Sequence, residues 1–169
     1  FDGRTNYGDD ARIPFHVTSA DWQDSDRLLA GLMTAFGAPT TAIPISGHGT
    51  FDGTMFETFR RPRIEGDFAG EQMRAFDVNW GRIAGAVVIE NSYATVRDVT
   101  VGTPGSEIVT SGKYSLGFPR RDGGDEIDAL VRVNGRPVKD LRHAFGLDDY
   151  EVDGLLSGEF RVLGKYQQP

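Results

Sequence analysis

The chain has 169 residues, of which 22 are glycine and none is cysteine, and its formal net charge is −7. The lack of cysteine excludes disulfide bonds and thiolate metal sites. The acidic balance argues against nucleic acid as a partner, because contacts to phosphates need basic patches. The chain begins at Phe1 inside a strand-like pattern, so we expect it to be one β-rich segment, residues 1–169, of a larger protein.

The N-terminal residues 1–18 predict a β-hairpin. Ile13, Phe15 and Val17 alternate with polar neighbours, which is the two-residue period of a half-buried strand. Gly8, followed by Asp9 and Asp10, provides the turn that would precede this strand.

Residues 19–37 predict the one long amphipathic helix of the chain. Ser19 is the expected N-cap and Gly37 the expected left-handed residue after the last turn. The simplest expectation is a lid that packs its apolar side over the sheet, and the alternative is a helix that plugs or gates a cavity. The apolar side comprises Leu28, Leu29, Leu32, Met33 and Phe36.

Residues 43–136 predict an antiparallel meander of strands. Short apolar runs recur there between turn signals, and without helices between them sequential strands pair directly. Pro137 and Gly146 bound a predicted short helix at 137–146, and residues 150–164 return to a strand. The turn signals are Asn79-Trp80-Gly81, Asn91-Ser92, Thr103-Pro104-Gly105, Arg121-Asp122-Gly123-Gly124 and Asn134-Gly135.

A faint internal repeat accompanies the glycine excess. Ile45-Ser46-Gly47 is followed by Gly53, and Leu156-Ser157-Gly158 is followed by Gly164, at an offset of 111 residues. We expect these glycines, with Gly66 and Gly112, to lie at strand bends. A repeat of this length indicates that units stack edge to edge in a longer array.

Apolar residues within the strands are the main candidates for a binding surface. Alternation gives each strand one apolar face, and that face meets either a protein core or an apolar ligand. We predict that one such face lines a groove for lipid. The predicted groove residues are Phe51, Phe68, Phe76, Val78, Trp80, Val87, Ile89, Val96, Tyr114 and Phe160.

Catalytic and metal-binding patterns are sparse. The histidines His16, His48 and His143 lack the spacing of a zinc site, and Gly47-His48-Gly49 lacks the third glycine of a dinucleotide-binding loop. We therefore predict no catalytic residue, no resident metal and no cofactor. The one candidate for Ca²⁺ is the acidic loop with Asp122, Asp125, Glu126 and Asp128, which is more simply a tight turn.

Several stretches between residues 43 and 164 resemble the repeating unit of the translocation and assembly module TamB and its AsmA-like relatives. The first stretch is Ile45-Ser46-Gly47-His48-Gly49-Thr50-Phe51-Asp52-Gly53, followed by Arg61-Pro62-Arg63-Ile64-Glu65-Gly66-Asp67-Phe68. Val87 to Val99, Ser111-Gly112-Lys113-Tyr114 and Val152 to Gly158 resemble later parts of the same unit. The helix at 19–37 departs from that pattern.

The resemblance implies a fold, a place and partners. It implies an open, curved, U-shaped antiparallel sheet (a "β-taco") with an apolar interior, in the periplasmic part of a protein anchored in the inner membrane. The expected partners are phospholipid acyl chains, an outer-membrane β-barrel protein and adjacent repeat units of the same chain.

Three functional hypotheses follow. The first is a non-catalytic conduit for phospholipid transport, outer-membrane protein assembly or both, because an apolar groove lowers the cost of about 0.8 kcal/mol for each exposed CH₂ group. The second is a closed β-sandwich that binds carbohydrate or protein in a secreted protein. The third is an enzyme with a polar pocket at His48 or at residues 122–128.

Overall fold

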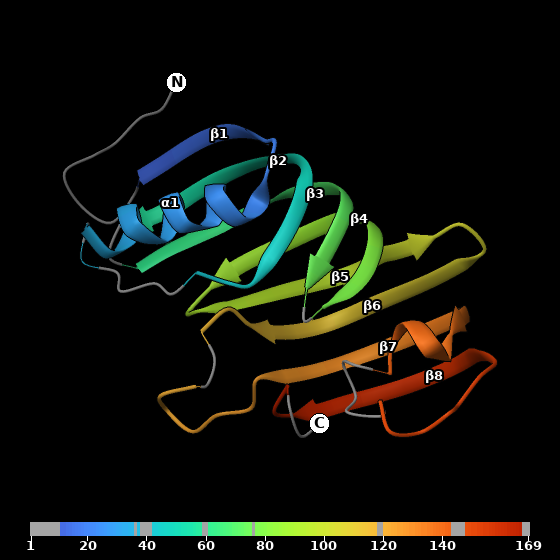
Figure 1. The fold of residues 1–169 in the computed structure, drawn as a ribbon. Helices are drawn as coiled ribbons and strands as arrows, with labels where there is room; N and C mark the ends of the chain where they lie inside the picture. Colours follow the sequence, from blue (N-terminus) through green and yellow to red (C-terminus); the bar gives the residue numbers. More distant parts are fainter. Residues whose placement is uncertain are drawn as a thin grey trace.

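The computed structural model describes residues 11–35, 37, 42–58, 61–75, 77–117, 120–142 and 148–166, except for the side chain of Met33. The described strands form one open sheet in which each strand pairs antiparallel with the next one along the chain (Figure 1). The closed β-sandwich of the second hypothesis is therefore not the architecture of these strands. The elements are β1 (Ala11–Ser19), α1 (Trp22–Ala35), β2 (Ile45–Thr58), β3 (Arg61–Ala75), β4 (Val78–Glu90), β5 (Tyr93–Thr103), β6 (Ser106–Ser115), β7 (Ile127–Pro137), the 3₁₀ turn η1 (Val138–Asp140) and β8 (Leu155–Gly164).

Two local predictions need correction, and a third lies partly outside the described residues. The third is the hairpin at 1–18: β1, its second half, pairs with β2, and residues 1–10 are not among the described residues. The predicted helix at 137–146 is the single 3₁₀ turn η1, with residues 143–147 outside the described part. Asn79 and Asn134, which signalled turns, lie inside β4 and β7, where register shifts between the paired strands absorb extra residues.

The sheet has one apolar and one polar face because its register keeps like residues in the same row. One row joins Ile13 of β1, Met55 of β2, Ile64 of β3 and Ile89 of β4. The neighbouring row on the other face joins Arg12 of β1, Phe56 of β2 and Arg63 of β3, and Arg63 Nε lies 4.0 Å from Oε2 of Glu90 in β4. A slip of one residue would exchange the two faces, so the strand pattern specifies this pairing strongly.

Two non-adjacent strands converge at one end of the sheet. Arg136 of β7 donates hydrogen bonds to the carbonyl oxygen of Asn79 in β4 and, at 3.2 Å, to Oγ1 of Thr103 in β5. In a flat sheet β4 and β7 would lie about 14 Å apart, which exceeds the reach of an arginine side chain. The best-packed core lies at this end and includes Met73, Val78, Ile108, Val133, Arg136 and Leu141.

Glycine permits close strand approach on the apolar face. Gly53 and Gly66 lie opposite one another in β2 and β3. A Cβ atom on Gly66 would lie 2.3 Å from the carbonyl oxygen of Asp52, and a Cβ on Gly49 would lie 2.0 Å from that of Ala69. Real Cβ contacts are never this short, so these positions require glycine.

Helix α1 begins and ends near the predicted residues but faces the sheet differently. Asp21 is the N-cap in place of Ser19, since its Oδ1 accepts a hydrogen bond from the Gln23 N–H at 2.9 Å. The sheet side carries Trp22 and Ala30, which are buried. Leu28, Leu29 and Leu32, which we expected to pack on the sheet, are 66, 43 and 47% exposed.

Candidate functional site

The apolar face holds most described residues of the predicted groove. Register places Phe51 opposite Phe68, and Val87 opposite Val96. Ile89 pairs with Ala94, which pairs with Tyr114 in turn. Phe160 lies on the same face, and Val78 and Trp80 lie at its end near Arg136, whose guanidinium is 6.0 Å from the centre of the Trp80 ring. Phe76 lies outside the described residues.

Exposure divides these residues into two groups. Val78 is 1% exposed and belongs to the core beside Arg136. Most others, such as Val87 and Val96, are half-buried, and Phe160 on β8 is 39% exposed. These residues are thus only partly withdrawn from solvent, whereas Val99, Ile108, Ala129 and Val133 on the same face are buried.

Cover over the apolar face is concentrated at the first strands. Helix α1 packs on β2, and the ring of Trp22 lies 5.2 Å from the ring of Phe68 in β3 (Figure 1). The carboxylate of Asp26 accepts a hydrogen bond from the Ile43 N–H at 2.6 Å and ties the helix to the chain before β2. Among the described elements, no helix or strand packs extensively over β4 to β8.

The prediction omitted further residues of this face. Val131 pairs with Phe160, and Ala129 pairs with Val162, so β7 and β8 extend the apolar surface to the sheet edge. The two-residue period in 127–133 and 160–162 is the signal that would have found them.

Two hydroxyl groups within the apolar face, those of Thr110 and Tyr114, are satisfied locally. The Thr110 hydroxyl lies 2.5 Å from the Tyr114 hydroxyl and donates to the Leu130 carbonyl oxygen at 3.1 Å. Burial raises the pKa of the Tyr114 phenol above its usual value. Tyr114 therefore stays neutral at physiological pH.

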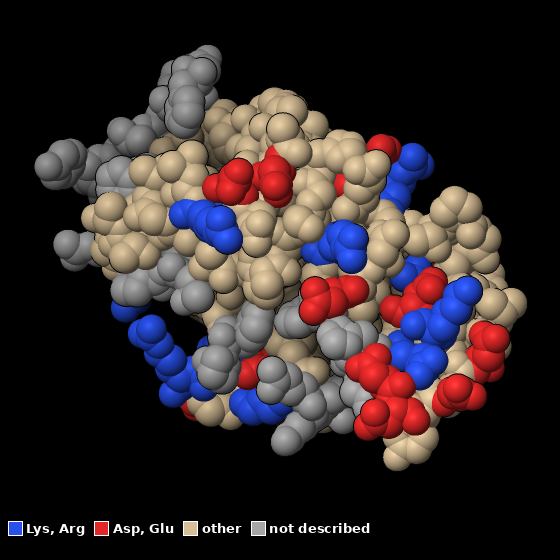
Figure 2. Space-filling view, in the orientation of Figure 1, with Lys and Arg blue, Asp and Glu red and all other residues tan. Residues whose placement is uncertain are grey.

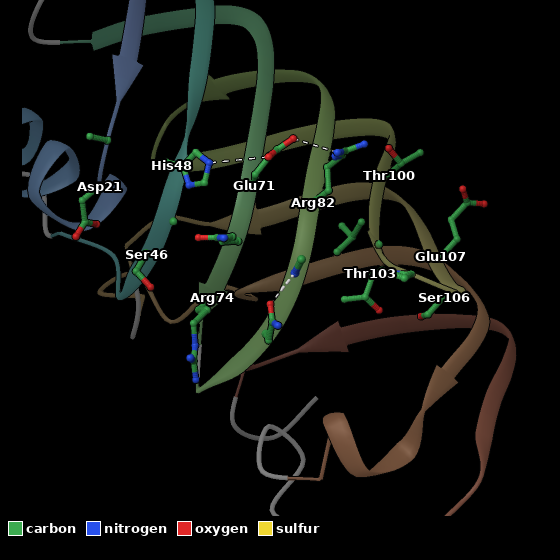
Figure 3. Close-up of a pocket in the computed structure, with 18 residues that line it drawn as sticks. Asp21, Ser46, His48, Glu71, Arg74, Arg82, Thr100, Thr103, Ser106 and Glu107 are labelled. Atoms are coloured by element: carbon green, nitrogen blue, oxygen red, sulfur yellow. Dashed lines mark hydrogen bonds and ion pairs between the residues drawn. The ribbon is translucent and has the colours of Figure 1, made fainter.

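An open hollow of about 1030 Å³, lined by both polar and apolar groups, lies at the strand ends on the other face. Figure 3 shows His48, Glu71 and Arg82 in a row across β2, β3 and β4. Arg82 Nη2 lies 3.0 Å from Glu71 Oε1, whereas His48 Nε2 is 3.9 Å from Glu71 Oε2, beyond hydrogen-bond distance. The His48 side chain is 45% exposed and that of Arg82 is 74% exposed, so these are solvated surface pairs of small energetic value.

The acidic loop does not gather its carboxylates. Asp122 pairs with Arg120 and accepts a hydrogen bond from the Gly124 N–H at 3.0 Å, which holds its pKa well below the usual range. Glu126 is buried and accepts a hydrogen bond from the Tyr166 N–H at 3.0 Å. Asp128 pairs with Arg161 on the polar face, at 3.3 Å.

The backbone oxygen of Asp125 accepts a hydrogen bond from the Tyr93 hydroxyl at 2.8 Å. Among the described residues no group of three His, Cys, Asp or Glu side chains could hold a metal ion. The loop is instead fastened by the Arg120 guanidinium, which lies 4.2 Å from the centre of the Tyr93 ring.

Charges of both signs are interspersed on the polar surface. Arg132 pairs with Glu159 across β7 and β8, and His16 Nδ1 lies 2.5 Å from Asp52 Oδ1 across β1 and β2. Figure 2 shows acidic and basic side chains close together, both over α1 and over the β7–β8 end of the sheet. On the face seen there, the described residues form no extended basic patch for a polyanion.

No protein-family profile, curated protein or solved structure matches this chain. Within the described residues no helix combines the length and apolar character that crossing a membrane requires. The site therefore has to be interpreted from its own geometry.

Proposed function

We propose that the apolar face of this sheet is a non-catalytic conduit that shields acyl chains of phospholipids from water. The observation that carries the proposal is the row of half-buried side chains formed by Ile89, Ala94, Tyr114 and Ile127, over which no second layer packs extensively among the described elements. Each CH₂ group taken out of water contributes about 0.8 kcal/mol, so a long chain binds without any polar anchor.

The shape we propose is an open, U-shaped groove. The convergence of β4 and β7 at Arg136 and the close approach of β2 and β3 at Gly66 both support a sheet that curls toward its apolar side. Because α1 covers the apolar face at β2 and β3, the half-buried residues on β4 to β8 would be the accessible part of the groove.

The resemblance to TamB-like proteins leads to the rest of the proposal. On that basis the segment belongs to the periplasmic part of an inner-membrane-anchored protein, works with an outer-membrane β-barrel partner, and continues into adjacent repeat units. Guiding strands of outer-membrane proteins during assembly would use the same apolar face.

The experiment is a binding assay with a pyrene-labelled phospholipid, together with lipid extraction and mass spectrometry of the purified protein. Val96→Asp places a charge on the apolar face, and Thr95→Asp places the same charge on the exposed polar face of β5. We expect Val96→Asp to lower binding at least tenfold and Thr95→Asp to leave it unchanged, with both variants checked for wild-type thermal melting. Absence of bound lipid in the wild-type protein, or equal losses in both variants, would contradict the proposal.

A further inference from the structure

Strand β8 forms one edge of the sheet, with β7 as its neighbour on one side. It is ten residues long and contains no proline, so its outward N–H and C=O groups can pair along its length. In the internal repeat, β8 corresponds to β2, which has partners on both sides. The sequence pattern that β8 shares with β2 is thus compatible with a second strand paired to the outer edge of β8.

Apolar side chains are exposed along this edge. Leu155 is 72% exposed, Phe160 39% and Leu163 50%. Natural edge strands usually avoid such exposure, because an uncovered apolar edge recruits another strand. The charged residues Glu159 and Arg161 flank Phe160 on the polar face.

We propose that β8 pairs antiparallel with β8 of a second copy of this chain, on a two-fold axis at Phe160. In that register Phe160 opposes its own counterpart, and Glu159 of each copy opposes Arg161 of the other. Leu156 then opposes Gly164, so the pairing uses nearly the whole of the strand. Glu159 and Arg161 lie on either side of Phe160, so the two-fold axis that pairs these charges also lies near the middle of the strand.

Charge complementarity selects this register. Glu159 lies 3.2 Å from Arg132, and Arg161 lies 3.3 Å from Asp128, across β7 and β8 of the same chain. Pairing at Phe160 would add two Glu159–Arg161 contacts, giving alternating charges from one β7 to the other. A shift by two residues would bring Glu159 opposite Glu159 or Arg161 opposite Arg161, and like charges directly opposite are destabilising.

The same register keeps the apolar faces of both copies on one side. A two-fold axis perpendicular to the sheet leaves each face on its own side, and Phe160 meets Phe160 of the second copy on the apolar side. The apolar surface would then continue across the interface. This inference does not depend on what the apolar face binds. It places an adjacent repeat unit, as proposed above, at the other edge of the sheet, which is β1.

The first test uses the absence of cysteine from the chain. Phe160→Cys places two thiols opposite one another across the axis, so mild oxidation should give a disulfide-linked dimer. Leu163→Cys is the matched control, because its thiol would lie about 20 Å from its counterpart along the paired strands. No cross-linking at position 160, or equal cross-linking at both positions, would overturn the proposed register.

The second test reverses charges and measures the dimer dissociation constant by analytical ultracentrifugation. Glu159→Arg and Arg161→Glu each create two like-charge pairs and should weaken the dimer about tenfold. The double variant should recover most of the affinity, and Arg132→Ala, which breaks only the pair within one chain, should retain it. A wild-type chain that stays monomeric up to its solubility limit would overturn the proposal and leave this edge to another strand.

Discussion

The guanidinium of Arg136 in β7 donates a hydrogen bond to the carbonyl oxygen of Asn79 in β4, although β5 and β6 separate these strands in the sheet. Arg136 is 1% exposed, and its Nε lies 3.9 Å from Oδ2 of Asp140 in η1. One side chain therefore connects β4, β5 and the turn after β7. These contacts of Arg136 limit how far β4 and β7 can separate at this end of the sheet.

Replacement of Arg136 by methionine should destabilise the protein by about 2–4 kcal/mol. Methionine fills much of the volume but leaves the Asn79 carbonyl oxygen without its charged donor. Urea denaturation measures the effect. Arg132→Met, which removes an exposed pair with Glu159, is the control and should change stability by less than about 1 kcal/mol. Similar losses in both variants would argue against a bridging role for Arg136.

Two glycine substitutions should act in opposite directions. Gly66→Ala forces a Cβ to within 2.3 Å of the Asp52 carbonyl oxygen and should cost about 1–3 kcal/mol. Gly31 lies in the exposed part of α1 with no atom within 4 Å of its Cβ position, so Gly31→Ala should stabilise the helix by about 0.5–1 kcal/mol. Thermal melting distinguishes the two, and a neutral Gly66→Ala would refute the close approach of β2 and β3.

Substitutions in α1 should separate its sheet side from its solvent side. Trp22 is 8% exposed and contacts Phe68, so Trp22→Ala should cost about 3–5 kcal/mol. Leu32 is 47% exposed, so Leu32→Ala should cost less than about 1 kcal/mol. Chemical denaturation followed by circular dichroism gives both values. The reverse order would mean that α1 uses its leucine side against the sheet.

Asp26 should make stability fall as the pH rises through the acidic range. Burial raises the pKa of its carboxyl group, although the hydrogen bond from the Ile43 N–H opposes that rise. The folded state therefore holds this proton to higher pH than the unfolded state, and the cost appears between the unfolded pKa of about 3.9 and the higher folded pKa.

Asp26→Asn keeps an acceptor for the Ile43 N–H and removes that ionisation. Its stability relative to the wild type should therefore increase between pH 3.5 and pH 7, as measured by urea titration at both values. Asp24→Asn, on an exposed part of the same helix, controls for the loss of one negative charge. A relative stability of Asp26→Asn that does not change with pH would contradict this assignment.

The sequence by itself determined the strands, their antiparallel order and the composition of the two faces. These properties follow from a two-residue period and from short connections, which are local features of the chain. The register places Phe51, Phe68, Val87, Val96 and Phe160 on one face of the sheet, as their alternation in the sequence indicates.

The tertiary structure alone decided what lies over that face. The leucines of α1 indicated one packed side, but the N-terminal attachment at Asp21 and the large ring of Trp22 turned another side to the sheet. Likewise, the sequence gives no sign that Arg136 is more than an exposed charged residue next to Gly135. Only the fold brings the Asn79 carbonyl oxygen within reach of its guanidinium. Periodicity specifies a residue's face, whereas contacts between distant strands depend on the path of the whole sheet.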